Sequence, residues 1–480
     1  MENSDKPINY LNPEELGSSD DEFIIPSVRS NTDFMKLWIG QTISNIGSFF
    51  AFIAIIFFTL RLSNDLDPTR QAQALALVTL IQVIPSFVFG PFSGVLVDRF
   101  DRKKIMVIMD IIGAGTSFTM ILIAELWQIY ALVSFYSIIR VFFYPAKQAA
   151  LPMIVDPENI MAANSLSQTT MQLSKIIGPA LSGFVVAWFG IQMAFIIDGT
   201  SFVISAISIL FIRSNLKPAS ATSKLTLKSS LVDLKKGFTI AWENIVIRFA
   251  FATMVLFLIA AAMIDPLLAF YLSYQFGLGE SAFGLLVSLS AVTGLVTAII
   301  VGSQKNIDRK LLMICSTMLI GGVGVMLIGL APYIATPQIA LFGGMAVLGL
   351  VNVMVMIPLS SLIQTIVEEE NMGKVNGIMG AILSLTQLGG AAIAGFLVTF
   401  LPVNLIYIGS ASFLLVAFVG QIGVLHKFGI EQEAQEQQEF MIKVKREKLQ
   451  QKNGITVPDI IIEGEVENPL LYPENKQPTN

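Results

Sequence analysis

The sequence predicts an all-α membrane protein whose twelve transmembrane helices form two pseudo-symmetric six-helix halves. Three observations predict this fold class: the composition, a series of long apolar segments, and an internal repeat. Of the 480 residues, 54% are hydrophobic and 14% are charged, and the mean hydropathy is +0.70. Soluble proteins carry about 25% charged residues. So apolar a chain cannot hide its surface in a water-soluble core, which favours a polytopic membrane protein.

Twelve apolar segments approach or exceed the roughly 20 residues that cross a bilayer as a helix. They lie at 34–60, 72–97, 105–126, 128–148, 162–189, 192–212, 248–275, 281–303, 310–331, 337–366, 374–401 and 404–425.

Positive charges in the connections orient these segments, since cytoplasmic loops are enriched in Lys and Arg. The only Lys or Arg residues in the connections from odd to even segments are Arg61 and Arg70. The even-to-odd connections contain Arg99, Arg102, Lys103, Lys104, Arg213, Lys217, Lys224, Lys228, Lys235, Lys236, Lys305, Arg309 and Lys310. We therefore expect the even-to-odd connections and both termini to be cytoplasmic, in a multi-pass protein of the cell (inner or plasma) membrane.

A shift of 212 residues aligns the two halves. It pairs Asn159 with Asn371, Asn164 with Asn376, Gly178 with Gly390 and Gly183 with Gly395. Parallel repeats of six helices, with substrate held between them, are a transporter architecture. We expect an acidic tail without secondary structure at 1–30, an N-terminal half at 31–213, a linker with an amphipathic helix at 214–247, a C-terminal half at 248–426 and a cytoplasmic tail at 427–480.

Composition excludes several other classes of protein. The first 30 residues carry −5 and the last 54 carry −3, so the body is +3, and nothing indicates nucleic-acid binding. The chain shows no nucleophile triad, phosphate-binding loop or metal-ligand spacing. We expect no enzymatic activity, no catalytic residue, no cofactor and no metal. The single histidine, His426, ends the last apolar segment, so a proton relay inside the membrane must use carboxylates.

The connection between the second and third segments carries the most specific motif. Gly94, Asp98, Arg99, Arg102 and Lys103 resemble the loop 2–3 motif of the major facilitator superfamily. The family's usual second glycine is replaced by Asp101. Gly178-Pro179 with Gly183 is similar to the superfamily's antiporter motif.

A second pattern resembles one branch of that superfamily, the enterobactin exporters and macrolide-efflux transporters. It covers the residues Phe142 to Pro152, Asn164 to Leu166 and Phe195 to Phe202. The resemblance implies export of a small molecule, and it does not identify the compound.

Five of the ionisable residues inside the apolar segments are candidates for function, because a charge at membrane depth usually faces a partner or a cavity. At 1.5 Å per residue, Asp110 and Arg140 both lie roughly 9–12 Å from the inner surface, so these two could form a pair. Lys175 lies roughly 20 Å deep. Two carboxylates are expected near its level: Asp198 and Asp265. The functional interpretation is a proton-coupling charge relay, and the alternative is a set of static pairs that fix helix packing.

Polar residues in the segments predict a substrate cavity or bonds between helices. Gln41 and Asn45 share one helical face, as do Gln168 and Gln172. By the repeat, Arg140 matches Asn352 and Lys175 matches Gln387. We hypothesise that the N-terminal half handles protons while the C-terminal half hydrogen-bonds substrate. Further wall candidates are Phe49, Phe142, Met171, Met354 and Met356.

Two features could control conformation. Pro179 removes a helix hydrogen bond, and Gly178 and Gly183 permit close helix approach. Asp98 could dock on the N-terminus of the eleventh segment, near Gly373-Lys374, where the helix dipole favours an anion. Asp98 would then be a latch of the outward-open state.

These patterns predict a secondary transporter that exports a small amphiphilic compound, such as a drug, macrolide or siderophore, by exchange with protons. We expect a monomer whose partners are the substrate, protons and the lipid bilayer. Two alternatives remain open: a transporter of lysophospholipids or similar lipids, and a non-transporting membrane receptor or scaffold.

Overall fold

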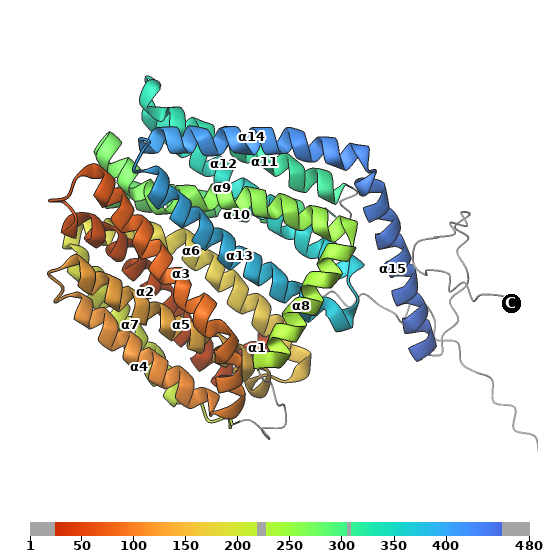
Figure 1. The fold of residues 1–480 in the computed structure, drawn as a ribbon. Helices are drawn as coiled ribbons and strands as arrows, with labels where there is room; N and C mark the ends of the chain where they lie inside the picture. The colour runs from red at the N-terminus through yellow and green to blue at the C-terminus, as the bar shows by residue number, and fades with distance from the viewer. Residues whose placement is uncertain (1–24, 218–226, 305–308, 454–480) are drawn as a thin grey trace, which may run out of the picture.

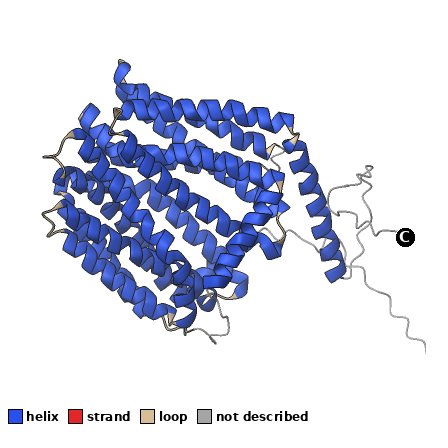
Figure 2. Cartoon of the chain, in the orientation of Figure 1, coloured by secondary structure: helices blue, strands red, loops and turns tan. Residues whose placement is uncertain are grey.

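The computed structural model describes residues 25–217, 227–304 and 309–453. Within these ranges the chain folds into helices joined by short connections, and no strand is present (Figures 1 and 2). The expected tail at 1–24, most of the linker before residue 227 and the end of the chain after 453 lie outside the described residues.

The first described range, residues 25–217, contains seven helices and a 3-10 turn. They are α1 (Ile25–Ser30), α2 (Thr32–Leu62), α3 (Pro68–Arg99), α4 (Arg102–Met120), α5 (Leu126–Ile154), η1 (Pro157–Asn159), α6 (Ile160–Phe189) and α7 (Ile191–Leu210). The rest of the described chain comprises α8 (Leu227–Glu243), α9 (Ile245–Phe276), α10 (Glu280–Gly302), α11 (Lys310–Leu330), η2 (Ala331–Tyr333), α12 (Pro337–Ile366), α13 (Glu369–Leu397), α14 (Val403–Lys427) and α15 (Ile430–Asn453).

Eleven helices of the described chain are long and apolar enough to cross a membrane. The remaining candidate, α4, carries Arg102, Lys103, Lys104 and Asp110 among its 19 residues, and these charges lower its hydropathy. It nevertheless packs against α5 and α7 within the bundle (Figure 1). The all-α membrane fold predicted from the sequence is therefore confirmed.

One expectation for the N-terminal tail is wrong. Residues 25–30 were expected to lack secondary structure, but they form α1. Val28 of this helix is 2% exposed and joins an apolar cluster that contains Phe34 and Leu37. Burial of this side chain gives the short helix the tertiary support that an isolated turn lacks. The Asn31 amide, just after α1, donates to the Ile154 carbonyl at 2.8 Å.

Short polar side chains cap the N-termini of several long helices. The Asn31 side chain accepts from Phe34 N at 2.9 Å, and Asp67 accepts from Arg70 N at 3.1 Å. Asp101 caps α4 by accepting from Lys103 N at 3.0 Å. Such caps satisfy backbone donors that have no partner inside the helix. The cap explains the aspartate at a position where the resembled motif has glycine.

The basic connections of the N-terminal half meet at one end of the bundle, which we call the basic end. The Lys103 ammonium donates to the Ile212 carbonyl at 2.8 Å. Asp33 accepts from Arg213 N and from Ser214 N and Oγ at 2.8–2.9 Å, and it pairs with Lys36. These bonds join the starts of α2 and α4 to the chain that leaves α7. We call the opposite end, which carries Arg61 and Arg70, the distal end.

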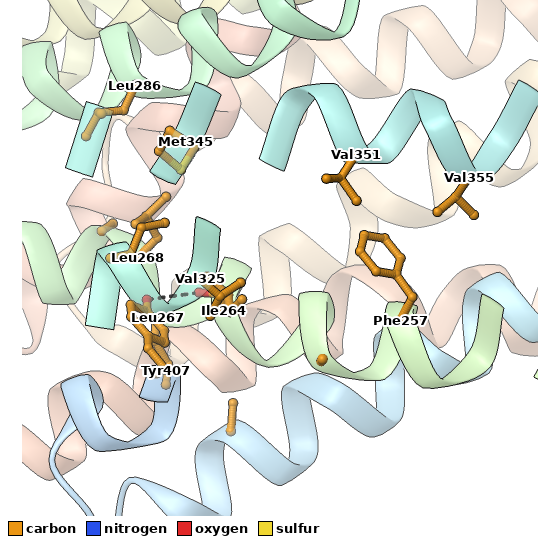
Figure 3. Close-up of a cluster of buried hydrophobic side chains, with 14 of the residues drawn as sticks. Phe257, Ile264, Leu267, Leu268, Leu286, Val325, Met345, Val351, Val355 and Tyr407 are labelled. Carbon is orange, nitrogen blue, oxygen red and sulfur yellow. Dashed lines mark hydrogen bonds between the residues drawn. The ribbon is translucent and has the colours of Figure 1, made fainter. Parts of the chain in front are cut away.

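The larger apolar core extends through both halves, and Figure 3 shows the part of it that lies in the C-terminal half. Phe257 of α9 faces Val351 and Val355 of α12, as Figure 3 shows. The Tyr407 hydroxyl donates to the Ile264 carbonyl at 3.2 Å. Tyr407 is completely buried, so this bond satisfies a polar group that would otherwise be costly to bury.

Helices α8 and α15 lie at the basic end of the C-terminal half (Figure 1). Gly237 of α8 packs against the Lys374 carbonyl in the first turns of α13. On α15, Gln437 accepts from the Asn244 amide at 2.9 Å, and Gln438 accepts from Lys310 at 3.1 Å. Helix α15, which lies in the expected cytoplasmic tail, is therefore docked on the bundle.

Glu431 of α15 caps α11, because its carboxylate accepts from Leu312 N at 2.9 Å. Loss of a capping side chain costs about 1 kcal/mol. We expect Glu431→Ala to increase hydrogen exchange in α15 and in the first turn of α11, whereas Glu431→Gln keeps an acceptor. Equal exchange in wild type and Glu431→Ala would contradict the capping role.

The same contact predicts a pH dependence. Burial raises the pKa of Glu431 above its ordinary value of 4.5, although hydrogen bonds from the α11 backbone and the charge of Arg309 act against this. A raised pKa in the docked state stabilises docking fully below pH 4.5, and that contribution is lost as the pH rises through the raised value. After correction for intrinsic exchange, protection of α15 should fall over this range in wild type and stay level in Glu431→Gln.

Candidate functional site

A cavity of about 390 Å³ lies at the basic end of the N-terminal half. Its walls come from the first turns of α2, the last turns of α5 and the first half of α6. The lining residues are Phe34, Leu37, Trp38, Gln41, Thr42, Asn45, Tyr144, Lys147, Gln148, Leu151, Pro152, Ile160, Asn164, Ser167, Gln168, Thr170 and Met171. The volume lies within the range of about 300–1,000 Å³ that is usual for ligand pockets.

Aromatic and polar groups are combined in these walls. The Trp38 indole donates to Thr170 Oγ1 at 3.0 Å, which fixes the ring of α2 against α6. Gln41 donates from Nε2 to Ser205 Oγ on α7 at 3.1 Å. A wall of apolar rings with a few oriented polar groups suits an amphiphilic ligand.

Asp110 of α4 lies behind the cavity wall. It is 1% exposed, and neither carboxylate oxygen accepts a hydrogen bond from the described residues. The Ser205 hydroxyl lies beside it without hydrogen-bond geometry. A row of polar side chains therefore extends from Gln41, which lines the cavity, through Ser205 to Asp110. A charge on a carboxylate without donors in this environment would be costly.

Asp198 of α7 has a different environment, although it is also fully buried. The Ser117 hydroxyl of α4 donates a short hydrogen bond to Oδ2, and the Tyr136 hydroxyl of α5 lies 3.3 Å from Oδ1. Arg140, one turn after Tyr136, lies close enough to interact electrostatically with Asp198. Two donors and a nearby cation stabilise a negative charge at this position.

The expected pairing of Asp110 with Arg140 is wrong for this structure. The side chain of Arg140 is exposed and forms no salt bridge within the described chain, while Asp110 has no cationic partner there. Helical phase is the physical reason. Arg140 shares a face of α5 with Tyr136, four residues earlier, and that face is directed to Asp198.

The structure does not bring Lys175 together with the two deeper carboxylates. Lys175 is exposed on α6, and Asp265 is exposed on α9, each without a salt bridge in the described chain. Asp198 is enclosed by α4 and α5 instead. Lys175, Asp198 and Asp265 therefore lie at similar depths without contact, because their side chains do not face one another.

Of the expected cavity residues, Gln41, Asn45, Gln168 and Met171 line the cavity. The others do not line it in this structure: Gln172, Asn352, Gln387, Phe49, Phe142, Met354 and Met356. Sequence reasoning assigned no site role to Lys147 and Gln148. The fourth segment was expected to end at residue 148, but α5 continues to Ile154, so both residues lie inside a helix.

The two halves touch closely at the distal end. A Cβ on Gly183 of α6 would lie 3.2 Å from Gly284 Cα of α10, and the reverse distance is the same. Gln73 of α3 donates to Thr399 Oγ1 beyond α13 at 2.9 Å. The rings of Phe57 and Phe283 meet edge to face, with centroids 5.7 Å apart. These contacts close the bundle at the distal end.

The motif glycines occupy matching places in the two halves. Gly178 faces Phe49 of α2, and its repeat partner Gly390 faces Ala262 of α9. Likewise Gly183 faces α10, while Gly395 faces Ala76 of α3. Each pair contacts the corresponding helix of the repeat, as a duplication with approximate two-fold symmetry requires.

At the basic end, a Cβ at Gly94 or Gly373 would meet no atom within 4 Å. Arg99 is exposed, and Arg102 donates from its backbone to Leu216 O at 3.3 Å. The side chain of Asp98 lies outside the described residues, so its expected docking on α13 stays a prediction.

Comparisons with known proteins agree with this architecture. The sequence model of the Major Facilitator Superfamily matches residues 37–380 and 249–452. The uncharacterized MFS-type transporter YfiS of Bacillus subtilis is 28% identical over 409 residues, covering 84% of this chain and 95% of that protein. Macrolide efflux protein A of Streptococcus pyogenes is 25% identical over 389 residues, covering 77% and 90%.

The fold is also similar to a solved transporter. A crystal structure of a bacterial homologue of the iron transporter ferroportin, in an inward-facing state, aligns with a TM-score of 0.59 at 20% identity. The alignment covers 82% of this chain and 98% of that one. The resemblance inferred from residues 94–104 and 142–152 is confirmed: the chain belongs to the major facilitator superfamily.

Proposed function

We propose that this transporter exports small amphiphilic compounds across the cell membrane in exchange for protons, by alternating access of the two halves. The observation that carries the proposal is the asymmetry of the bundle. A cavity with aromatic and amide walls lies at the basic end, while close contacts between the halves lie at the distal end. The similarity to macrolide efflux protein A supports the export of an amphiphile.

The basic end faces the cytoplasm in this proposal, because cytoplasmic loops are enriched in Lys and Arg. Both termini then lie in the cytoplasm, and the structure represents a state that loads substrate from inside the cell. Rocking of the halves would separate Gly183 from Gly284 at the distal end. Asp98 of α3 and the start of α13 would approach each other in the opposite state.

We assign proton coupling first to the carboxylates of Asp110 and Asp198. Arg140, which is exposed on α5, is included as the cation that interacts with Asp198. No residue that the structure describes donates a hydrogen bond to Asp110, so binding a proton relieves the cost of its charge. Asp198 has two donors and a nearby cation, so its charge is supported. Two buried carboxylates of the same half in such unlike environments are suited to separate roles. Lys175 and Asp265 remain secondary candidates, because both are exposed in the membrane-spanning helices.

Transport in proteoliposomes tests the proposal. With an acidic lumen, an antiporter moves protons out and drives an external amphiphile inward. We expect fluorescent amphiphiles to accumulate in the lumen and to leave when an ionophore collapses the gradient. Vesicles without protein serve as the control.

Other outcomes discriminate the rival functions. Movement of lysophospholipid that is independent of the pH gradient would favour a lipid transporter. Absence of flux for every amphiphile and lipid, with protein that remains folded, would favour a receptor or scaffold.

A further inference from the structure

Of the described residues that line the cavity, one carries a charge, Lys147 of α5. None of these lining residues is an aspartate or glutamate. Across the described chain, no salt bridge and no hydrogen bond joins Lys147 to another residue. The cavity therefore offers a positive charge that the protein itself does not neutralise.

The position of Lys147 makes this charge costly. It lies seven residues before the last residue of α5, Ile154, which corresponds to roughly 10 Å at 1.5 Å per residue. Its side chain is partly buried. Charges at membrane depth generally face a partner, a substrate path or water. Here the side chain borders a cavity, so a ligand can supply the missing anion.

Amide and aromatic side chains line the same cavity as Lys147. Neutral amides of Asn45, Gln148, Asn164 and Gln168 line the same cavity, and each can donate hydrogen bonds to an oxygen-rich group. The rings of Phe34, Trp38 and Tyr144 line it as well. A single cation, several amide donors and an aromatic wall together suit an apolar body that carries one negative group.

We propose that Lys147 binds the anionic group of the substrate, so that the cavity selects amphiphilic organic anions over neutral or cationic amphiphiles of the same shape. This inference rests on the proposed function, because it assigns the substrate class of the same cavity. Lys147 is a specificity-determining residue in this assignment, and it acts by direct contact with the carboxylate, sulfonate or phosphate of the compound.

Three fluorescent probes with one apolar body test the assignment: dansylglycine, dansylglycinamide and dansyl-ethylenediamine, which carry a negative, neutral and positive group. We expect wild type in proteoliposomes to prefer dansylglycine over the amide by about tenfold, as one charge-assisted hydrogen bond can provide. Lys147→Gln should raise the KM for dansylglycine by about tenfold and leave the amide within about twofold. Lys147→Arg should restore the preference.

The matched control is Lys427→Gln, which removes an exposed lysine at the end of α14 and should leave all three KM values unchanged. A purely structural role for Lys147 would lower transport of the three probes equally, and that result would overturn the inference. Equal transport of dansylglycine and its amide by wild type would overturn it too, while the exporter itself would stand. Failure of wild type to move any of the three probes would count against the exporter and this inference together.

Discussion

Replacing Gly183 with leucine is expected to abolish transport while leaving the two halves folded. The Gly183 position faces the backbone of α10 at Glu280 and Gly284, and helix backbones cannot move aside as a flexible side chain can. Overpacking costs about 1–3 kcal/mol. This cost would shift the equilibrium between the states with a closed and an open distal end by roughly 5–150-fold. The distal end would be held open, and the cycle would stop because alternating access requires it to close.

Cross-linking measures this shift directly. Gln73 and Thr399 are hydrogen-bonded across the distal end, so cysteines at both positions should be joined by a short bifunctional thiol reagent. The reaction should be efficient in the wild-type background and weak with Gly183→Leu. Gly409→Leu is the matched control, because a Cβ at Gly409 would meet nothing within 4 Å. Efficient cross-linking together with normal transport in Gly183→Leu would show that distal closure does not depend on this approach.

Replacing Asp110 with asparagine is expected to uncouple transport from the proton gradient. The amide has the shape of the protonated acid and cannot exchange a proton. One pH unit provides about 1.4 kcal/mol per proton, which supports about tenfold accumulation of substrate. In proteoliposomes with an acidic lumen, the accumulation ratio of the variant should fall to about one. Exchange of labelled for unlabelled substrate should continue, because the cavity residues are unchanged.

The control for Asp110→Asn is Asp156→Asn, since Asp156 is exposed between α5 and α6 and is assigned no role in coupling. Full gradient-driven accumulation by Asp110→Asn would exclude Asp110 as the coupling carboxylate. Asp198→Asn would then be the next variant to measure. Its wild-type carboxylate accepts bonds from Ser117 and Tyr136, so the amide would leave one of these donors without its acceptor and also destabilise the N-terminal half.

The internal repeat could be predicted from the sequence, but the helices that its glycines contact could not. Matching Gly178 with Gly390 and Gly183 with Gly395 indicated a duplication, and each pair does contact equivalent helices. Small residues permit close approach wherever they occur. Their repetition at a fixed shift therefore marked the helices that pack closely, but it did not name the partner helix.

The charged residues show where sequence reasoning failed. The rise of 1.5 Å per residue gave reasonable depths for Asp110, Arg140 and Asp198. Depth was not sufficient, because a contact also requires that two side chains face each other. Arg140 approaches Asp198 instead of Asp110, and Lys175 has neither carboxylate as a partner in the described chain.

The sequence by itself determined the all-α membrane fold, the apolar segments and the separation of connections rich in Lys and Arg from connections poor in them. These depend on local composition, since the bilayer imposes the same length and polarity on every helix. Only the tertiary structure decided which faces meet, that α5 continues past residue 148 to place Lys147 in a cavity, and that the halves close at the distal end. Those outcomes depend on packing between helices far apart in the chain, which no local pattern encodes.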